Sequence, residues 1–234
     1  MYKRIILKLS GETLAPENKS GSFDAARVDR AAKAIADLAD LGVQVGVVMG
    51  GGNIWRGRFT DAMNPVLADQ MGMLATIINA LCVQDAIQRL GRKAAVFTAQ
   101  EMTRFADLYR ADRAVAALER GEIVLLAGGS GNPFFTTDTA AALRAAELGA
   151  DAVFKGTTVD GVYDSDPRKN PDAKLIRDIT YQETIDLGLK VMDTAAFQLC
   201  RDQRIPVIRI FNMDDLDNVL RVARGEAIGT VVHP

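Results

Sequence analysis

Four segments of this chain carry glycines, hydroxyls and basic side chains directly after apolar runs that predict β-strands. They are Lys8-Leu9-Ser10-Gly11-Glu12 and residues 50–57, 128–138 and 155–167. Successive glycines let backbone N–H groups approach an anion, and lysine or arginine adds positive charge. Ligands of open α/β sheets collect where strands end. We therefore expect one edge of the predicted sheet to bind anionic groups such as phosphates.

Each segment also has a purely structural interpretation. A lysine that leaves a strand, such as Lys8 or Lys155, is commonly a solvated charge, and three glycines in a row are compatible with a tight turn. Helix-capping side chains are available in the third segment, namely Thr136, Thr137 and Asp138. The same helix N-terminus favours a bound anion. Four such junctions in one chain exceed what structure alone requires.

Other chemistries are poorly supported. The only histidine is His233, the penultimate residue, so a Ser-His-Asp or Cys-His mechanism lacks its base. Cys82 and Cys200 lie in helix-like segments without paired spacing, which argues against a disulfide or a zinc site and predicts two buried apolar residues. Any metal here should be held by oxygen atoms.

Composition predicts a globular protein that works in the cytoplasm. The chain has 234 residues, of which 48% are hydrophobic and 25% charged, and a net charge of −2. This supports a substantial core and provides no overall basic field for nucleic acid. The apolar run near the N-terminus is three residues long, too short for a signal peptide or a membrane span.

Strand-like runs alternate with helical periodicity along the chain. Predicted strands cover residues 5–9, 43–48, 94–98, 123–127, 152–155, 207–211 and 230–232. Predicted helices cover residues 24–41, 65–90, 111–119, 138–148, 191–203 and 216–223, the first with Asp24 as its N-cap. This order predicts a three-layer α/β/α sandwich with a mainly parallel central sheet, in a single domain over residues 1–234. Residues 166–171 are expected to form an exposed loop.

Seven segments, in order across nearly the whole chain, resemble the uridylate kinase branch of the amino acid kinase family. They are Lys8-Leu9-Ser10-Gly11-Glu12, residues 50–57, 69–76 and 131–138, Val159-Asp160-Gly161-Val162-Tyr163, Lys190-Val191-Met192-Asp193 and Phe211-Asn212-Met213. The segment at 159–163 also occurs in aspartate and glutamate 5-kinases of the family. Residues 131–138 (GNPFFTTD) and 71–76 (MGMLAT) favour the uridylate kinases, as does a length that leaves no room for the extra domains of the other two.

The resemblance implies that ATP phosphorylates UMP reversibly to UDP, in the synthesis of pyrimidine nucleotides. It implies an ATP site made of Lys8, Leu9, Ser10, Gly11, Gly52, Arg56, Thr157, Tyr163 and Asp166. It implies a UMP site made of Gly51, Asp69, Ser130, Gly131, Asn132, Pro133, Phe134, Phe135, Thr136 and Thr137. Asp69 would accept hydrogen bonds from the ribose hydroxyls. The UMP-binding part would be mainly N-terminal and the ATP-binding part mainly C-terminal.

Phosphoryl transfer requires two anions to be positioned and charge on the migrating group to be neutralised. Lys8, Arg56 and Lys155 are the candidate cations, with Asp138 as the residue that orients the lysines or a bridging Mg²⁺. Magnesium is expected chiefly on the nucleotide phosphates, with no dedicated protein site.

Two other functions remain open at this point. One is a phosphoryl transferase of the same family that acts on a carboxylate or carbamate, and the other is a nucleotide-sensing protein without catalysis. For assembly and regulation, the resemblance implies a homohexamer built on dimers, activated by GTP and inhibited by UTP. Many relatives carry arginine where this chain has Gln84, which puts the GTP response in doubt.

Overall fold

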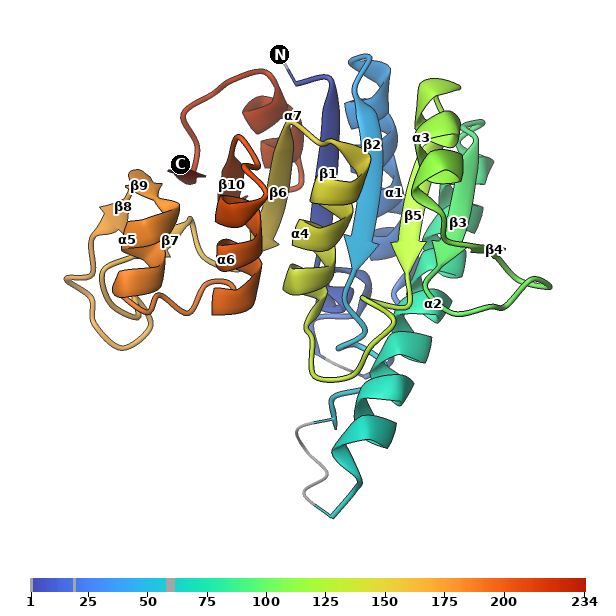
Figure 1. Ribbon diagram of the computed structural model, residues 1–234, viewed down its shortest axis with the longest axis horizontal. Helices are drawn as coiled ribbons and strands as arrows, with labels where there is room; N and C mark the ends of the chain where they lie inside the picture. Colours follow the sequence, from blue (N-terminus) through green and yellow to red (C-terminus); the bar gives the residue numbers. More distant parts are fainter. Residues whose placement is uncertain (1, 19, 58–61) are drawn as a thin grey trace.

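In the computed structural model, which describes residues 2–18, 20–57 and 62–234, a central sheet separates two layers of helices (Figure 1). Its nine strands in the described residues follow the order β4-β3-β5-β2-β1-β6-β10-β11-β9. They are β1 (Arg4–Leu9), β2 (Gln44–Met49), β3 (Ala94–Thr98), β4 (Asp107–Leu108), β5 (Ile123–Ala127), β6 (Ala152–Thr157), β9 (Asp178–Thr180), β10 (Ile208–Asn212) and β11 (Thr230–His233). A separate small ribbon pairs β7 (Val162–Tyr163) with β8 (Leu175–Ile176).

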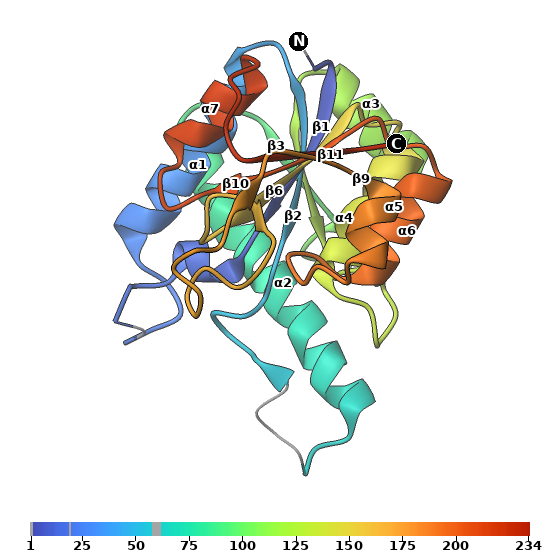
Figure 2. The ribbon, with the colours of Figure 1, turned by 90° about the vertical axis from the view of Figure 1, so that its left-hand side faces the viewer.

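The sheet is parallel except where β10 meets β11. Because β9 runs parallel to β11, these two strands point opposite to the other seven. The helices that connect the strands are α1 (Ala25–Asp40), α2 (Pro65–Arg89), α3 (Ala111–Glu119), α4 (Thr137–Leu148), α5 (Tyr181–Asp186), α6 (Thr194–Asp202) and α7 (Asp217–Ala223). Helices α1, α2 and α7 cover one face, and α3 to α6 cover the other (Figure 2).

The side chains of β1 pack alternately against the two helix layers. Ile5 and Leu7 enter the core beneath α1, α2 and α7, whereas Ile6 enters the core beneath α3 to α6. Alternate residues of a strand point to opposite faces, so a strand covered on both sides must be apolar throughout. This explains the continuous apolar runs in the sequence and confirms the predicted α/β/α sandwich.

Helix α2 extends well beyond the end of the sheet (Figure 1). Asn64 caps it through a 2.9 Å bond from the Val66 N–H, and Pro65 occupies the first turn. In length and hydropathy α2 would suffice for a membrane span. However, Val83 and Ile87 are fully buried against the sheet, which is typical of a core helix. One side of α2 carries an exposed apolar stripe, made of Leu67, Met71, Leu74 and Ile78.

Most predicted elements are confirmed, with local differences. The expected N-cap Asp24 accepts the Arg27 N–H at 2.9 Å, and residues 166–171 form an exposed loop. The helix predicted from residue 191 begins only at Thr194, because Asp193 caps it through the Ala196 N–H. Cys200 is buried as expected, whereas the expectation for Cys82 was wrong, since it is only partly buried. The short elements β4, β7, β8, β9 and α5 were not predicted.

Candidate active site

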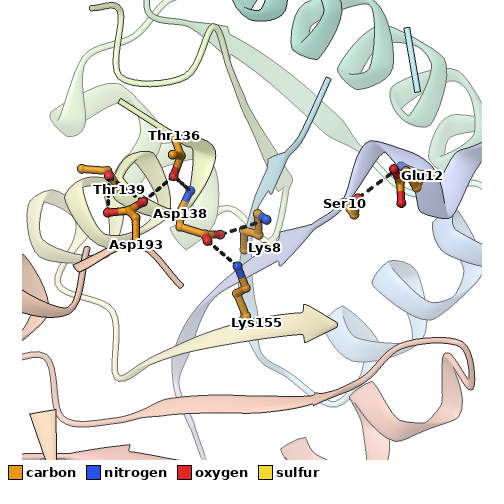
Figure 3. A network of polar contacts seen from close by, with 8 residues as sticks. All are labelled: Lys8, Ser10, Glu12, Thr136, Asp138, Thr139, Lys155 and Asp193. Atoms are coloured by element: carbon orange, nitrogen blue, oxygen red, sulfur yellow. Dashed lines mark hydrogen bonds and ion pairs between the residues drawn. The ribbon is translucent and has the colours of Figure 1, made fainter. Parts of the chain in front are cut away.

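Two lysines lie side by side where β1 and β6 end. The parallel pairing of these strands places Lys8 opposite Lys155. Asp138, in the first turn of α4, lies between the two ammonium groups (Figure 3). Lys8 Nζ is 2.8 Å from Asp138 Oδ1, and Lys155 Nζ donates a hydrogen bond to Oδ2. One carboxylate therefore holds two cations at the carboxyl end of the sheet.

Burial and the neighbouring lysine charges shift the pKa of Asp138 in opposite directions. The residue is only 9% exposed, and burial by itself would raise the pKa of its carboxyl group. The charges of Lys8 and Lys155 outweigh that effect and hold the pKa of Asp138 below its usual value. The carboxylate is thus ionised at neutral pH and is unsuited to accept a proton there.

Lys155 shows the complementary effect. It is 6% exposed, and burial, followed by the neighbouring charge of Lys8, lowers its pKa to about 8 although Asp138 opposes the shift. The ammonium is still the major form at pH 7, but burial and the charge of Lys8 destabilise it. An anion bound next to Lys155 would stabilise the charged form, so this environment favours phosphate binding.

A second cationic group lies at the start of the 3₁₀ helix η1 (Gly11–Leu14) and after β2. The Arg56 guanidinium donates to the Gly52 carbonyl oxygen at 2.9 Å and forms an ion pair with Glu12. Ser10 caps η1 through a 3.3 Å bond from the Glu12 N–H (Figure 3). Arg56 is therefore held beside η1 and lines the same cavity as Ser10.

Two of the predicted glycines are required by close packing. A Cβ at Gly11 would lie 2.3 Å from Asn53 Oδ1 and 2.6 Å from the Gly50 carbonyl oxygen. A Cβ at Gly51 would lie 2.8 Å from the Ala75 Cβ. At Gly52, by contrast, the nearest atom is 3.9 Å away, which leaves open space above its backbone. Packing accounts for the first two glycines, and Gly52 is the one that leaves room for a ligand.

A cavity of about 170 Å³ lies between the 128–138 loop and the N-terminal half of α2. Of the residues predicted to bind UMP, the following line it: Gly51, Asp69, Ser130, Asn132, Phe135, Thr136 and Thr137. The other three, Gly131, Pro133 and Phe134, lie in the same loop outside the lining. Asp69 Oδ2 accepts the Phe134 N–H at 2.7 Å, and Phe134 adopts a φ of 70°. Asp69 therefore fastens the loop to α2.

A larger cavity of about 640 Å³ lies on the other side of the lysine pair. It contains five of the predicted residues, namely Ser10, Lys155, Thr157, Tyr163 and Asp166. A neighbouring cavity of about 670 Å³ shares Ser10 and Thr157 with it and adds Leu9, Gly52 and Arg56. The Leu9 side chain belongs to the buried core, so this residue can offer a ligand only its backbone.

A further cavity beside the lysines connects the 170 Å³ cavity with the 640 Å³ cavity. A cavity of about 530 Å³ contains Lys8 and Asp138 and shares Thr136 and Thr137 with the 170 Å³ cavity. It shares the backbone turn at residues 188–191 with the 640 Å³ cavity. The arrangement can therefore hold two anionic ligands end to end, with Lys8, Asp138 and Lys155 at the junction.

Several candidate groups lie elsewhere or are absent. His233 is in β11, where its ring is 2.9 Å from Asp178 and this hydrogen bond raises its pKa. Within residues 2–18, 20–57 and 62–234, no group of three or more histidine, cysteine or acidic side chains is placed to hold a metal ion. Both oxygens of Asp138 already face lysines, so the donor set fits a metal that arrives on a phosphate ligand.

Sequence reasoning did not single out the polar residues of α2 that hold the loops. Asn79 is fully buried and donates to the Gly50 carbonyl oxygen at 2.7 Å, and it also pairs with Asn53. Thr76 Oγ1 accepts the Gly128 N–H at 2.8 Å. The signal available in the sequence was the presence of Thr76 and Asn79 within a largely apolar run, because polar side chains that become buried there need hydrogen-bond partners. Asp193 and Glu12 were also missed as individual residues.

Comparison with known proteins identifies the family of this chain. The sequence model of the amino acid kinase family matches residues 3–212. A uridylate kinase of Pseudoalteromonas atlantica is 50% identical over 236 aligned positions, which cover 100% of this chain and 95% of that protein. The chain belongs to the uridylate kinases of the amino acid kinase family.

Other uridylate kinases give the same result over the full length. A uridylate kinase of Phocaeicola vulgatus is 47% identical, with 99% of this chain and 98% of that protein covered. The crystal structure of UMP kinase from Bacillus anthracis superimposes with a TM-score of 0.96 at 37% identity, covering 99% of this chain and 96% of that one. The chain therefore shares its overall fold with this UMP kinase over nearly the full length of both chains.

Proposed function

We propose that this chain transfers the γ-phosphoryl group of ATP to the phosphate of UMP, reversibly, giving UDP for pyrimidine nucleotide synthesis. The observation that carries the proposal is the pair Lys8 and Lys155, which Asp138 holds together beside the cavities. We assign the 170 Å³ cavity to the phosphoryl acceptor and call it the acceptor-side cavity. We assign the 640 Å³ and 670 Å³ cavities to the phosphoryl donor and call them the donor side. Two ammonium groups with one carboxylate leave net positive charge where a phosphoryl group would pass. The family membership supports UMP as the acceptor.

ATP would occupy the donor side. Its phosphates would lie against Gly52 and Arg56 and reach Lys8 in the adjoining 530 Å³ cavity, and its nucleoside would lie against Thr157 and Tyr163. UMP would occupy the acceptor cavity between Asp69 and the 128–138 loop. In this proposal residues 1–234 form a single domain, whose UMP-binding part would be mainly N-terminal and whose ATP-binding part would be mainly C-terminal.

Chemistry would then need no general base. The second pKa of a phosphate monoester is about 6, so the attacking oxygen of UMP is already ionised at neutral pH. Lys8, Lys155 and Arg56 would neutralise charge on the migrating group while ATP and UMP are held in line. Asp138 keeps the two lysines together instead of accepting a proton.

Magnesium would arrive with ATP. It supplies further neutralisation of the phosphate charge, as in other phosphoryl transferases. Asp138 is the protein group that would orient the lysines or a bridging magnesium ion. Because the carboxylate of Asp138 is engaged by lysines, we propose that the nucleotide provides most of the metal ligands.

The assembly we propose is a homohexamer built on dimers, in the cytoplasm, with GTP and UTP as effectors. The exposed stripe of α2 supports a contact between copies, because four apolar side chains share one face of a projecting helix. In the effector region, Gln84 donates to the Ala94 carbonyl oxygen at 2.9 Å. Arg89 is paired with Asp29 and Asp85, so a GTP phosphate would have to compete for it.

One assay separates this proposal from its alternatives. ATP consumption is measured with UMP, CMP, AMP, aspartate and carbamate side by side. We expect UMP to be used at least a hundredfold better than CMP, because a site that hydrogen-bonds uracil leaves its groups unpaired with cytosine. Preference for aspartate or carbamate would assign another reaction of the family. Nucleotide binding without turnover of any acceptor would indicate a sensor.

A further inference from the structure

Asp193 lies at the N-terminus of α6 and connects this helix to α4, the helix that carries Asp138. Its carboxylate accepts the Ala196 N–H at 2.8 Å and so caps α6. The same carboxylate accepts a hydrogen bond from the Thr136 hydroxyl and, at 2.9 Å, one from the Thr139 hydroxyl (Figure 3). A helix cap needs only the first of these contacts. The other two join α6 to the first turn of α4.

The hydrogen bonds at Thr136 have a fixed direction. Thr136 Oγ1 accepts the Asp138 N–H at 3.0 Å, which caps α4. Its hydroxyl proton is therefore free to be donated, and Asp193 Oδ2 receives it. Only an acceptor at that position completes the chain of bonds from Asp193 through Thr136 to the backbone of Asp138.

Asp193 also ends the turn that borders the donor side. Residues 187–191 line the 640 Å³ cavity, and residues 188–194 line the 530 Å³ cavity that contains Lys8 and Asp138. Thr136 lines both that cavity and the acceptor-side cavity. A single carboxylate thus spans the boundary between the turn on the donor side and the loop on the acceptor side.

We infer that Asp193 is a positioning residue that holds Thr136 and the 130–137 loop in the arrangement that binds the acceptor phosphate. This deepens the proposed function and rests on it, because the loop is assigned to UMP. Asp193 acts through Thr136 and Thr139, because its two carboxylate oxygens are engaged by their hydroxyls and by the Ala196 N–H. Loss of its acceptor oxygen should weaken UMP use while ATP use stays nearly normal.

The substitution Asp193→Asn separates this role from capping. Asparagine caps helices about as well as aspartate, so α6 should keep its N-terminus. The new NH₂ group would face Thr136 Oγ1, which already accepts one hydrogen bond, and the hydroxyl proton would lose its acceptor. Asp24→Asn is the matched control, since Asp24 caps α1 through a 2.9 Å bond from the Arg27 N–H. Steady-state kinetics and melting temperature are measured for both variants and the parent.

We expect Asp193→Asn to raise the KM for UMP about tenfold, as loss of one charge-assisted hydrogen bond would, with the KM for ATP changed less than about twofold. Asp24→Asn should match the parent, and both melting temperatures should stay close to it. Kinetics of Asp193→Asn equal to those of Asp24→Asn would reduce Asp193 to a helix cap and overturn the inference. An equal rise in both KM values would also overturn it.

Thr139 provides a second test that leaves Asp193 in place. Thr139→Val removes one donor to the carboxylate, whereas Thr139→Ser keeps the hydroxyl. We expect a higher KM for UMP in the valine variant and near-parent values in the serine variant. Indistinguishable values for the two would count against the inference. A parent protein that does not phosphorylate UMP at all would instead overturn the proposed function, and that result needs no variant.

Discussion

Lys8 and Lys155 occupy the same register position on neighbouring parallel strands, and their ammonium groups share the carboxylate of Asp138. Burial, and after it the repulsion between the two like charges, lowers the pKa of Lys155 to about 8. The single carboxylate stabilises the pair but neutralises only one of its two positive charges. The result is a positive site at the end of the sheet, next to two cavities.

Replacement of Lys8 by methionine should lower kcat by about 10²- to 10³-fold, because a preorganised cation near the transferred group would be lost. The KM for UMP should change little, since Lys8 lies outside the lining of the acceptor cavity. Steady-state kinetics check this. Lys33→Met, which removes an exposed lysine paired with Asp37 on α1, is the control and should leave kcat unchanged. Near-normal kcat in Lys8→Met would remove this lysine from the chemistry.

The pKa of Lys155 predicts an alkaline limit to activity. Below its value of about 8 the side chain is mostly an ammonium ion, and above it the charge is lost. For the free enzyme, kcat/KM for ATP should therefore fall as the pH rises through about 8. Lys155→Arg keeps the charge at all accessible pH values. Whatever its absolute rate, this variant should lose the alkaline limb, and a limb that persists near pH 8 would assign it to another group.

Substitution of Asp69 should change the KM for UMP and leave the KM for ATP nearly unchanged. Its carboxylate holds the Phe134 N–H at 2.7 Å and lines the acceptor cavity. Asp69→Asn should raise the KM for UMP about tenfold by loosening the loop and weakening ribose contacts. The control is Asp112→Asn, an exposed aspartate in the first turn of α3 that pairs with Arg110. A change in the KM for ATP as large as that for UMP would contradict this role.

The apolar stripe of α2 predicts an assembly contact. Leu74 is 49% exposed at the middle of the stripe, and glutamate there should disrupt packing between copies. Sedimentation velocity should show a smaller species for Leu74→Glu. Leu90→Glu is matched in exposure, at 48%, but lies well around the helix axis from the stripe. If both variants sediment like the parent protein, the stripe is not the interface.

Sequence alone predicted the layers of the fold and most of the charged site. The end of a strand can be recognised in the sequence as an apolar run followed by glycine. Lys8 and Lys155 could therefore each be predicted to lie at a strand end. That they stand opposite each other depends on the pairing of β1 with β6, which joins residues 147 positions apart and leaves no local signal. Long-range polar contacts such as Asp193 with Thr136 escape sequence reasoning for the same reason.

Short elements were the other gap. Strands β7 and β8 have two residues each, too few for an alternating pattern to be recognised. Helix α5, whose capping box joins Thr180 and Glu183, was likewise not predicted, although its capping signature was present in the sequence. The helix predicted from residue 191 was extended too far because Val191 and Met192 fit its apolar spacing, while Asp193 was the true cap.

The central claim is that Asp138 organises two cations and does not act as a base. The pH dependence of kcat/KM for UMP, measured for the parent and for Asp138→Asn, tests it most directly. We predict an acid midpoint near the second phosphate pKa of free UMP, about 6, in both proteins. The variant should have a much lower kcat, because its lysines lose their shared carboxylate. An acid midpoint that disappears or moves by more than about one pH unit in Asp138→Asn would show that the aspartate titrates as a base, and would contradict the account.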